Sequence, residues 1–268
     1  MGRRTPNIEH RTRRGKAARQ EEIVSLVSKN GEVSVAKLAR RFRVSEMTVR
    51  RDLEQLYRSG RLRRTHGGAV PSRAGVAEFL FQQKRNLHAA QKRAIGHKVA
   101  TLIQPGMTVY LDTGTTTLEV ARAIAAIENL TVLTTSLVIA SELQTQANVD
   151  LILLGGNVRR DSPDLTGPLA EDNLARFRAD IGVVGADAVS PEGAFTTDIR
   201  VANVAKAIAA SATTVVLATD SSKFGKTAFA KYASLKDIDY VITDTGCPRA
   251  VRNWLREKAC KAIYAKTA

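Results

Sequence analysis

The hydrophobic residues in the first quarter of the chain recur at helical spacing. Ile23, Leu26 and Val27 lie three and four positions apart, which predicts a supporting helix over residues 18–29. Two more segments with the same period follow, and only residues 43 and 44 separate them. So short a link between two helices predicts a helix-turn-helix.

Each of these two later helices has its own start signal. Ser34 and Ser45 precede them, and a serine hydroxyl at this position can accept a hydrogen bond from a free amide of the first turn. In the second helix, Val49, Leu53 and Leu56 form a single apolar stripe. This helix therefore packs on one side and leaves the other side exposed.

The exposed side of the second helix is polar and contains two adjacent arginines. Together with the caps Ser34 and Ser45, its candidate DNA-contacting residues are Met47, Thr48, Arg50, Arg51 and Gln55. An arginine can donate two hydrogen bonds to one guanine in the major groove. A solvated charged face is the ordinary alternative. The caps, the short turn and a basic segment after the helix favour a recognition helix.

That basic segment, residues 61–70, predicts a strand, a Gly-Gly turn and a returning strand. Arg63 and Arg64 would then face the phosphate backbone, as in the wing of a winged helix. His66 stands beside the turn. We place it in the DNA-binding set and interpret it as a turn or packing residue rather than a catalytic one.

From residue 108 onward, short apolar runs alternate with helical stretches. The predicted strands are 108–111, 131–133, 151–154, 181–184, 215–218 and 240–243, and the predicted helices are 116–127, 137–147, 201–212 and 249–258. Continuous apolar strands separated by helices are typical of a parallel sheet covered on both faces. The expected fold class is α/β, with an N-terminal winged helix-turn-helix before a parallel α/β domain.

The positive charge of the chain is concentrated at its N-terminal end. The net charge is +15, and residues 1–70 contain 18 Lys+Arg against 7 Asp+Glu, which leaves only +4 for the remaining residues. This distribution favours a nucleic acid partner. Residues 1–16 are basic and poor in large apolar groups, which predicts a flexible arm that either lies along DNA or keeps the chain soluble.

The remaining composition excludes several classes of protein. We expect no signal peptide, no membrane span and no membrane partner, because no apolar run is long enough. Cys247 and Cys260 lack metal-binding spacing, so we expect no metal site and a reducing, cytoplasmic environment. We also expect no cofactor and no catalytic residue. The expected domains are an arm (1–16), a winged helix-turn-helix (17–70), a linker (71–91) and a sensor domain (92–268).

The ends of the predicted strands predict a ligand site, because ligands of such sheets bind beyond the carboxyl ends of the strands. The candidate effector-binding residues at these ends are Asp112, Thr113, Gly114, Thr115, Thr116, Thr135, Ser136, Gly155, Gly156, Arg159, Asp187 and Lys223. Residues 113–117 open a helix, where free amides and hydroxyls can hold a phosphate. We assign the phosphate to Thr115, Arg159 and Lys223, and sugar hydroxyls to Asp112 and Asp187. Capping or turn roles stay open for both carboxylates.

Beyond the N-terminal arm, nearly the whole chain resembles the DeoR family of bacterial transcription regulators. The resemblance depends on VSEMTVRRDL at 44–53, RTHGGA at 64–69, DTGTT at 112–116, Gly155-Gly156 with Arg159, and DSSKFG at 220–225. It implies a winged helix-turn-helix fused to a sensor related to ribose-5-phosphate isomerase. It also implies a repressor of a carbohydrate operon that is released by a phosphorylated sugar or sugar alcohol.

Two alternatives remain beside the repressor. One is an isomerase-like enzyme with a DNA-binding appendage; the isomerase family has an acidic residue on each side of Gly-Ala-Asp, where this chain has Val184 and Ala188. That difference favours binding without turnover. The other is a transcriptional activator, which shares the same motifs. The expected partners are a double-stranded DNA operator, a phosphorylated effector and further copies of the chain in a homodimer or homotetramer.

Overall fold

The computed structural model describes residues 8–258 and 261–267, with the side chains of 8–14 and 73–75 left out. The chain divides into two compact units. The first ends at Gln83 and includes Arg160–Ser162, and the second contains the rest from Lys84 onward. We call them the DNA-binding unit and the sensor unit below, and describe each by itself.

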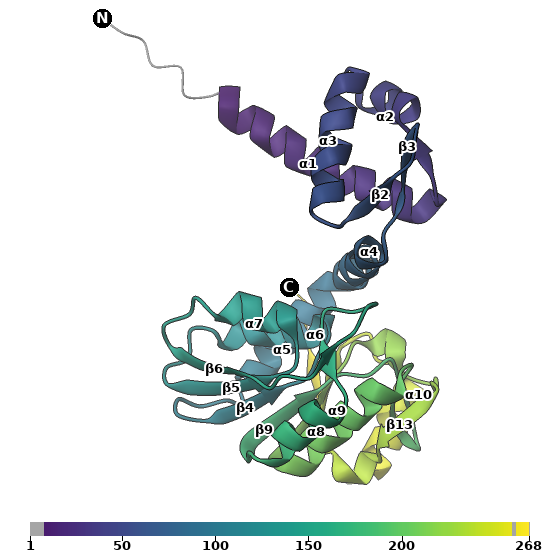
Figure 1. Ribbon diagram of the computed structural model, residues 1–268. Coiled ribbons are helices and arrows are strands. Elements are labelled where there is room, and N and C mark those ends of the chain that lie inside the picture. Colours follow the sequence, from purple (N-terminus) through teal and green to yellow (C-terminus); the bar gives the residue numbers. More distant parts are fainter. Residues whose placement is uncertain (1–7, 259–260, 268) are drawn as a thin grey trace, which may run out of the picture. The chain divides into compact units, whose positions relative to one another are not determined.

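The DNA-binding unit is a helix-turn-helix with a supporting helix and a small sheet (Figure 1). Its elements are α1 (Ile8–Asn30), β1 (Val33–Ser34), α2 (Val35–Phe42), α3 (Glu46–Arg58), β2 (Leu62–Arg64) and β3 (Gly68–Pro71). The three strands pair antiparallel in the order β1-β3-β2. Apolar residues of all three helices, among them Ile23, Leu38 and Leu53, form one buried core with the sheet. The predicted winged helix-turn-helix is confirmed.

Both predicted helix caps are present. The hydroxyl of Ser34 accepts from the amide of Lys37 at 3.3 Å, and that of Ser45 accepts from the amide of Thr48 at 3.2 Å. Arg43 ends α2 in the left-handed conformation, with φ of 52°. This tight reversal is what allows α3 to start after so short a link.

Part of the expected flexible arm is helical, and the expected linker contains helices as well. The supporting helix begins at Ile8, within the expected flexible arm, because residues 8–17 are rich in Arg and Lys, which favour helix, and contain no proline. The rest of the arm, residues 1–7, lies outside the described residues. The expected linker 71–91 contains α4 (Arg73–Asn86) and the start of α5 (Ala89–Ala100).

The sensor unit is built on a seven-stranded parallel sheet with strand order β15-β14-β12-β9-β4-β5-β6. The strands are β4 (Thr108–Leu111), β5 (Leu130–Thr134), β6 (Val149–Leu153), β9 (Ala179–Val184), β12 (Ala212–Ala218), β14 (Tyr240–Asp244) and β15 (Lys261–Ala265). All six predicted strands are present. The prediction missed β15, which pairs with β14 at the edge of the sheet.

Helices cover both faces of this sheet (Figure 1). One face is covered by α5, α6 (Thr115–Ile124) and α7 (Leu137–Leu143), and the other by α8 (Pro168–Ala175) and α9 (Ile199–Ser211). The last helix, α10 (Arg249–Glu257), packs on β15. Tyr110, Leu133 and Val184 are fully buried in the core between the layers. Within the described residues, no helix has the length and apolar character needed to cross a membrane.

Two small sheets extend the sensor unit beyond the predicted elements. A hairpin joins β7 (Asn157–Val158) to β8 (Leu165–Thr166), and a three-stranded antiparallel sheet contains β10 (Ala188–Ser190), β11 (Gly193–Thr196) and β13 (Ala230–Ala233). Their strands are short and irregularly spaced, so alternation of apolar residues does not reveal them. They bring Asp164 and Asp187 to the carboxyl ends of the main strands.

Candidate functional site

The exposed face of α3 presents the predicted DNA-contacting side chains. Met47 is 60% exposed, and Arg50, Arg51 and Gln55 are exposed as well, whereas Val49 lies in the core. Thr48 is half-buried, and its hydroxyl lies 3.0 Å from that of Ser45. The orientation of α3 predicted from sequence is therefore confirmed, although DNA contact itself stays a prediction.

The position of α3 on α1 depends on a buried carboxylate that sequence reasoning missed. Asp52 is 1% exposed and accepts hydrogen bonds from Arg19 Nε at 2.6 Å and from Gln20 Nε2 at 3.1 Å. Asp52 lies three residues after Val49 and next to Leu53, on the buried side of the helix. An acidic residue within an apolar stripe was the available signal for a buried ion pair.

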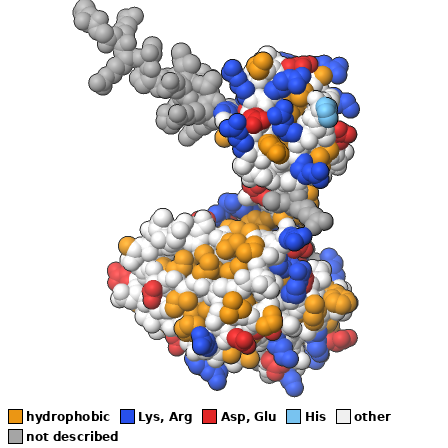
Figure 2. Space-filling view, viewed as in Figure 1, with side chains coloured by type: hydrophobic (Ala, Val, Ile, Leu, Met, Phe, Trp, Pro, Cys, Tyr) orange, Lys and Arg blue, Asp and Glu red, His pale blue; other side chains and the backbone are white. Residues whose placement is uncertain are grey.

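A basic hollow of about 500 Å³ lies on this side of the DNA-binding unit. Its lining residues come from α1, α3 and β2: Lys16, Arg50, Arg51, Glu54, Gln55, Arg58 and Arg64. Glu54 bonds to Arg58 at 2.9 Å and to Arg64 at 2.5 Å, and the hydrogen bond from Arg58 lowers the pKa of the Glu54 carboxyl. For Arg51, the described residues provide no carboxylate within ion-pair distance. Figure 2 shows lysine and arginine side chains distributed over the visible surface of this unit.

The wing has the predicted hairpin geometry. Arg63 and Arg64 lie exposed on β2, and His66 lies exposed in the turn before β3. The wing is attached to the start of α2 through Gly67, whose carbonyl accepts from the amide of Val35 at 2.9 Å. The cations of the wing and of α3 thus belong to one compact unit.

In the sensor unit, a polar cluster begins at the carboxyl end of β4. Asp112 is 2% exposed, and its carboxylate accepts from the amides of Thr113 at 2.7 Å and Gly185 at 3.2 Å. Burial raises the pKa of Asp112 to about 7. This carboxyl is therefore partly neutral near pH 7, which lowers its repulsion of a nearby anion.

Immediately after Asp112 the chain opens a helix with uncapped amides. Gly114 precedes α6 with φ of 145° and offers no side-chain cap. Thr115 and Thr116 form the first turn, where backbone N–H groups have no partner within the helix. Such amides favour a bound anion.

Arg159 is held between two carboxylates. Its Nε and Nη2 donate to the two oxygens of Asp164 at 2.6 and 3.0 Å, and its Nη1 donates to Asp198 at 2.9 Å. Asp164 is fully buried and also accepts from the hydroxyl of Thr113 at 3.0 Å. Arg159 therefore connects the β7–β8 hairpin to the end of β4 and the start of α9. Asp198 was not identified from sequence.

Asp187 faces both a threonine pair and a lysine. It accepts from the hydroxyl of Thr196 and from the amide and hydroxyl of Thr197, all at 3.0 Å, and Lys84 Nζ lies 3.7 Å away. Burial acts to raise the pKa of Asp187, but these hydrogen bonds and the charge of Lys84 bring it below its ordinary value. Of the two roles left open from sequence, these contacts correspond to a turn role, while binding of a sugar hydroxyl by Asp187 stays a prediction.

A buried lysine that sequence reasoning missed lies within electrostatic range of Lys223. Lys92 on α5 is 5% exposed, and its ammonium donates to the carbonyls of Lys84 and of Leu87, the latter at 2.7 Å. Burial lowers the pKa of Lys92, an effect that the charge of Asp220 opposes and that of Lys223 reinforces. Ile95 and Val99 mark the buried face of α5, so the spacing of Lys92 from them was the signal available.

The remaining predicted effector residues lie at strand ends with mixed surroundings. Ser136 caps α7 by accepting from the amide of Ile139 at 3.3 Å, and the hydroxyl of Thr135 is buried without a partner among the described residues. Gly155 and Gly156 have φ of 72° and 122°. A Cβ on Gly156 would lie 2.9 Å from that of Ala170, so this glycine allows close packing of α8.

The chain joins a winged helix-turn-helix to a parallel α/β unit, and polar and cationic side chains gather at the strand ends of that unit. This combination is typical of a DNA-binding regulator that responds to a ligand. Two family models match the chain in this order. The DeoR-like helix-turn-helix domain matches residues 19–73, and the DeoR C terminal sensor domain matches residues 87–245. The chain belongs to the DeoR family of transcription regulators, and is thus a regulator and not an enzyme.

Similar proteins cover most of the chain. The HTH-type transcriptional regulator GlpR of Haloferax volcanii is 37% identical over 229 residues, 85% of this chain and 89% of that protein. The glycerol-3-phosphate regulon repressor of Haemophilus influenzae is 32% identical over 247 residues, 91% and 95% of the two chains. Among solved structures, ribose 5-phosphate isomerase from Plasmodium falciparum matches 51% of this chain and 52% of its own, at 18% identity and a TM-score of 0.38.

Proposed function

We propose that this protein represses a carbohydrate operon in the cytoplasm and leaves its operator when a phosphorylated sugar or sugar alcohol binds the sensor unit. The observation that supports the proposal is the uncapped start of α6, which follows the buried carboxylate of Asp112 at the carboxyl end of β4. A phosphate suits the amides and Lys223, and sugar hydroxyls suit carboxylate and threonine oxygens. One of the similar proteins is named for a glycerol-3-phosphate regulon.

The cluster suggests how the effector residues divide their work. Thr115, Thr116 and Lys223 supply donors for the phosphate, while Asp112, Thr113 and the neighbouring Thr135 hydroxyl face the hydroxyls. Arg159, which we also predicted as a phosphate ligand, binds two carboxylates instead. Its contribution to the site is therefore the positioning of Asp164 and, through it, of Thr113.

A panel of sugar phosphates and sugar-alcohol phosphates tests the proposed function. A true effector at 100 times its Kd should stabilise the full-length protein by about 2.7 kcal/mol, and the same compound should release operator DNA in a gel-shift assay. Its unphosphorylated form should do neither. Lys223→Ala should abolish most of the shift, whereas Lys236→Ala, an exposed lysine in a separate 3-10 turn, should preserve it. If no compound in the panel stabilises the wild-type protein, the sensor assignment is wrong.

Operator recognition is proposed to depend on Arg51. Arg51→Ala should weaken operator binding by about 1–3 kcal/mol if the guanidinium binds a guanine. Arg51→Lys is the informative control, because it keeps the charge and loses the forked pair of hydrogen bonds. We expect Arg51→Lys to lose discrimination between operator and mutated operator in a salt-matched titration. Unchanged affinity for Arg51→Ala would exclude Arg51 from the base contacts.

The same motifs suit an activator, so the sign of regulation needs its own measurement. A reporter fused to the regulated promoter should rise in expression when the gene for this protein is deleted, and a fall would identify an activator instead.

We also propose a homodimer or homotetramer, because paired helix-turn-helix units read repeated half-sites. Light scattering of the full-length protein measures this state directly.

A further inference from the structure

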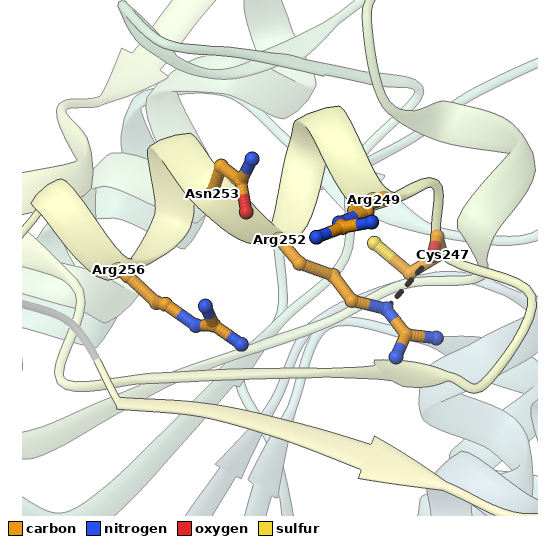
Figure 3. A pocket seen from close by; sticks show the side chains of 5 residues that line it. All are labelled: Cys247, Arg249, Arg252, Asn253 and Arg256. Atoms are coloured by element: carbon orange, nitrogen blue, oxygen red, sulfur yellow. Dashed lines mark hydrogen bonds between the residues drawn. The ribbon is translucent and has the colours of Figure 1, made fainter.

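A second basic hollow lies in the sensor unit, beside α10. It has a volume of about 410 Å³ and is lined by Cys247, Arg249, Arg252, Asn253 and Arg256 (Figure 3). None of these five residues is among those assigned to the effector, although Cys247 lies three residues after the carboxyl end of β14, where Asp244 accepts from the amide and hydroxyl of Ser221 at 2.7 and 2.9 Å. All of them follow residue 245, where the match to the family's sensor domain ends.

The sequence of α10 produces this stripe of cations. Arg249, Arg252 and Arg256 are spaced three and four residues apart, so they share one side of the helix. Val251 and Leu255 are buried on the opposite side, against the core of the unit. The helix is therefore anchored by its apolar side and directs three guanidinium groups to the surface.

Arg252 is held in place by neutral groups. Its Nε donates to the carbonyl of Cys247 at 2.9 Å, and its Nη2 donates to the carbonyl of Thr245 at 2.5 Å. The guanidinium also lies over the ring of Tyr264, 4.6 Å from its centroid. These contacts fix the orientation of the charge without neutralising it.

The hollow contains no carboxylate to balance its cations. Arg249 and Arg256 have no ion-pair partner among the described residues, and the lining includes no Asp or Glu. Burial raises the pKa of the Cys247 thiol, which keeps that group uncharged. Three positive charges on one short helix repel one another, and a bound anion would relieve this repulsion.

The spacing of the arginines indicates what kind of anion fits. Arg249 and Arg252 lie one turn apart on α10 and both line the hollow, so they can share one phosphate (Figure 3). Arg256 stands two turns from Arg249, about 10 Å along the helix axis, which calls for a second anionic group. A hollow of this size is also at the scale of small-molecule sites, about 300–1,000 Å³.

We propose that the α10 hollow binds a small anion with two linked phosphate groups, as a ligand separate from the sensor's effector. Pyrophosphate carries about three negative charges near neutral pH, equal in number to the arginines. A nucleoside diphosphate and a sugar bisphosphate share this chemistry. Arg249 and Arg252 bind the first phosphate, and Arg256 and the Asn253 amide bind the second.

Calorimetric titration of the full-length protein with pyrophosphate in about 0.15 M salt tests this site. Wild type should bind with saturation, and a double variant, Arg249→Gln with Arg256→Gln, should bind at least about tenfold more weakly. Both side chains are exposed, so this variant should keep its melting temperature. Lys231→Gln with Lys236→Gln removes the same charge from exposed positions of the same unit and should change the Kd by less than about twofold.

Two further titrations distinguish this site from the effector site and from the DNA-binding surface. Lys223→Ala should preserve pyrophosphate binding, and its loss there would place the anion in the effector site instead. Orthophosphate should bind more weakly than pyrophosphate, while a nucleoside diphosphate and a sugar bisphosphate identify the natural source. Absence of saturable pyrophosphate binding to wild type would overturn the proposal. So would an Arg249→Gln/Arg256→Gln variant that binds pyrophosphate normally but loses operator affinity, because α10 would then contact DNA.

Discussion

Gly68→Ala is expected to disrupt the wing and abolish specific operator binding. A Cβ on residue 68 would lie 2.2 Å from the carbonyl oxygen of Val33 and 2.9 Å from the Cα of Ser34. Both atoms are backbone of β1, which pairs with β3 at this point, so neither can move without breaking the sheet. We expect a loss of about 3 kcal/mol or more in the stability of the DNA-binding unit.

Strands β1 and β3, which the new Cβ would force apart, also connect directly to the elements predicted to contact DNA. Residue 34 caps α2, and the carbonyl of residue 68 accepts from the amide of Thr65 in the wing turn. Loss of the β1–β3 pairing therefore affects both the helix-turn-helix and Arg63 and Arg64 on β2. Operator affinity should fall by about two orders of magnitude or more.

Gly67→Ala is the matched control for this prediction. The neighbouring glycine is exposed, and a Cβ there would meet no atom within 4 Å. Calorimetry and operator titration of both variants should show a lowered transition of the DNA-binding unit for Gly68→Ala only, with the sensor unit unchanged. Equal behaviour of the two variants would mean that the wing tolerates the displacement.

The helix-turn-helix could be predicted almost completely because its signals are local. The hydroxyls of Ser34 and Ser45 each accept from the amide three residues later, and Val49, Leu53 and Leu56 repeat at the helical period. Likewise, the buried strands of the sensor unit are continuous apolar runs. The edge strand β15 was missed because its sequence, KAIYA, is short and only partly buried.

The location of the candidate site stays a prediction from strand order, and the pairing of its charges could not be predicted. The carboxyl ends of parallel strands meet at one edge, so Asp112, Thr115 and Lys223 could be assigned to one site from order alone. Which charges pair depends on contacts between residues far apart in sequence. Asp198 lies 39 residues after Arg159 and Asp187 lies far from Lys84, so no local spacing reveals these partners.

Arg159 can either position Asp164 or contact the effector's phosphate. The variant Arg159→Gln distinguishes these two roles. Its fork on Asp164 joins side chains that are 11% and 1% exposed, respectively. Removal of the guanidinium takes this cation away from the buried Asp164 carboxylate. Breaking a buried pair in this way costs about 3–5 kcal/mol, so the sensor unit should melt at a lower temperature even without ligand.

Arg200→Gln is the control within the same network. Arg200 also binds Asp198, but its side chain is 52% exposed, and an exposed pair contributes about 1 kcal/mol or less. A structural role for Arg159 predicts a large loss of ligand-free stability for Arg159→Gln and a small one for Arg200→Gln. A direct phosphate contact predicts unchanged ligand-free melting with weaker effector binding. Because Asp164 is fully buried and needs a counter-charge before any ligand arrives, we expect the first result.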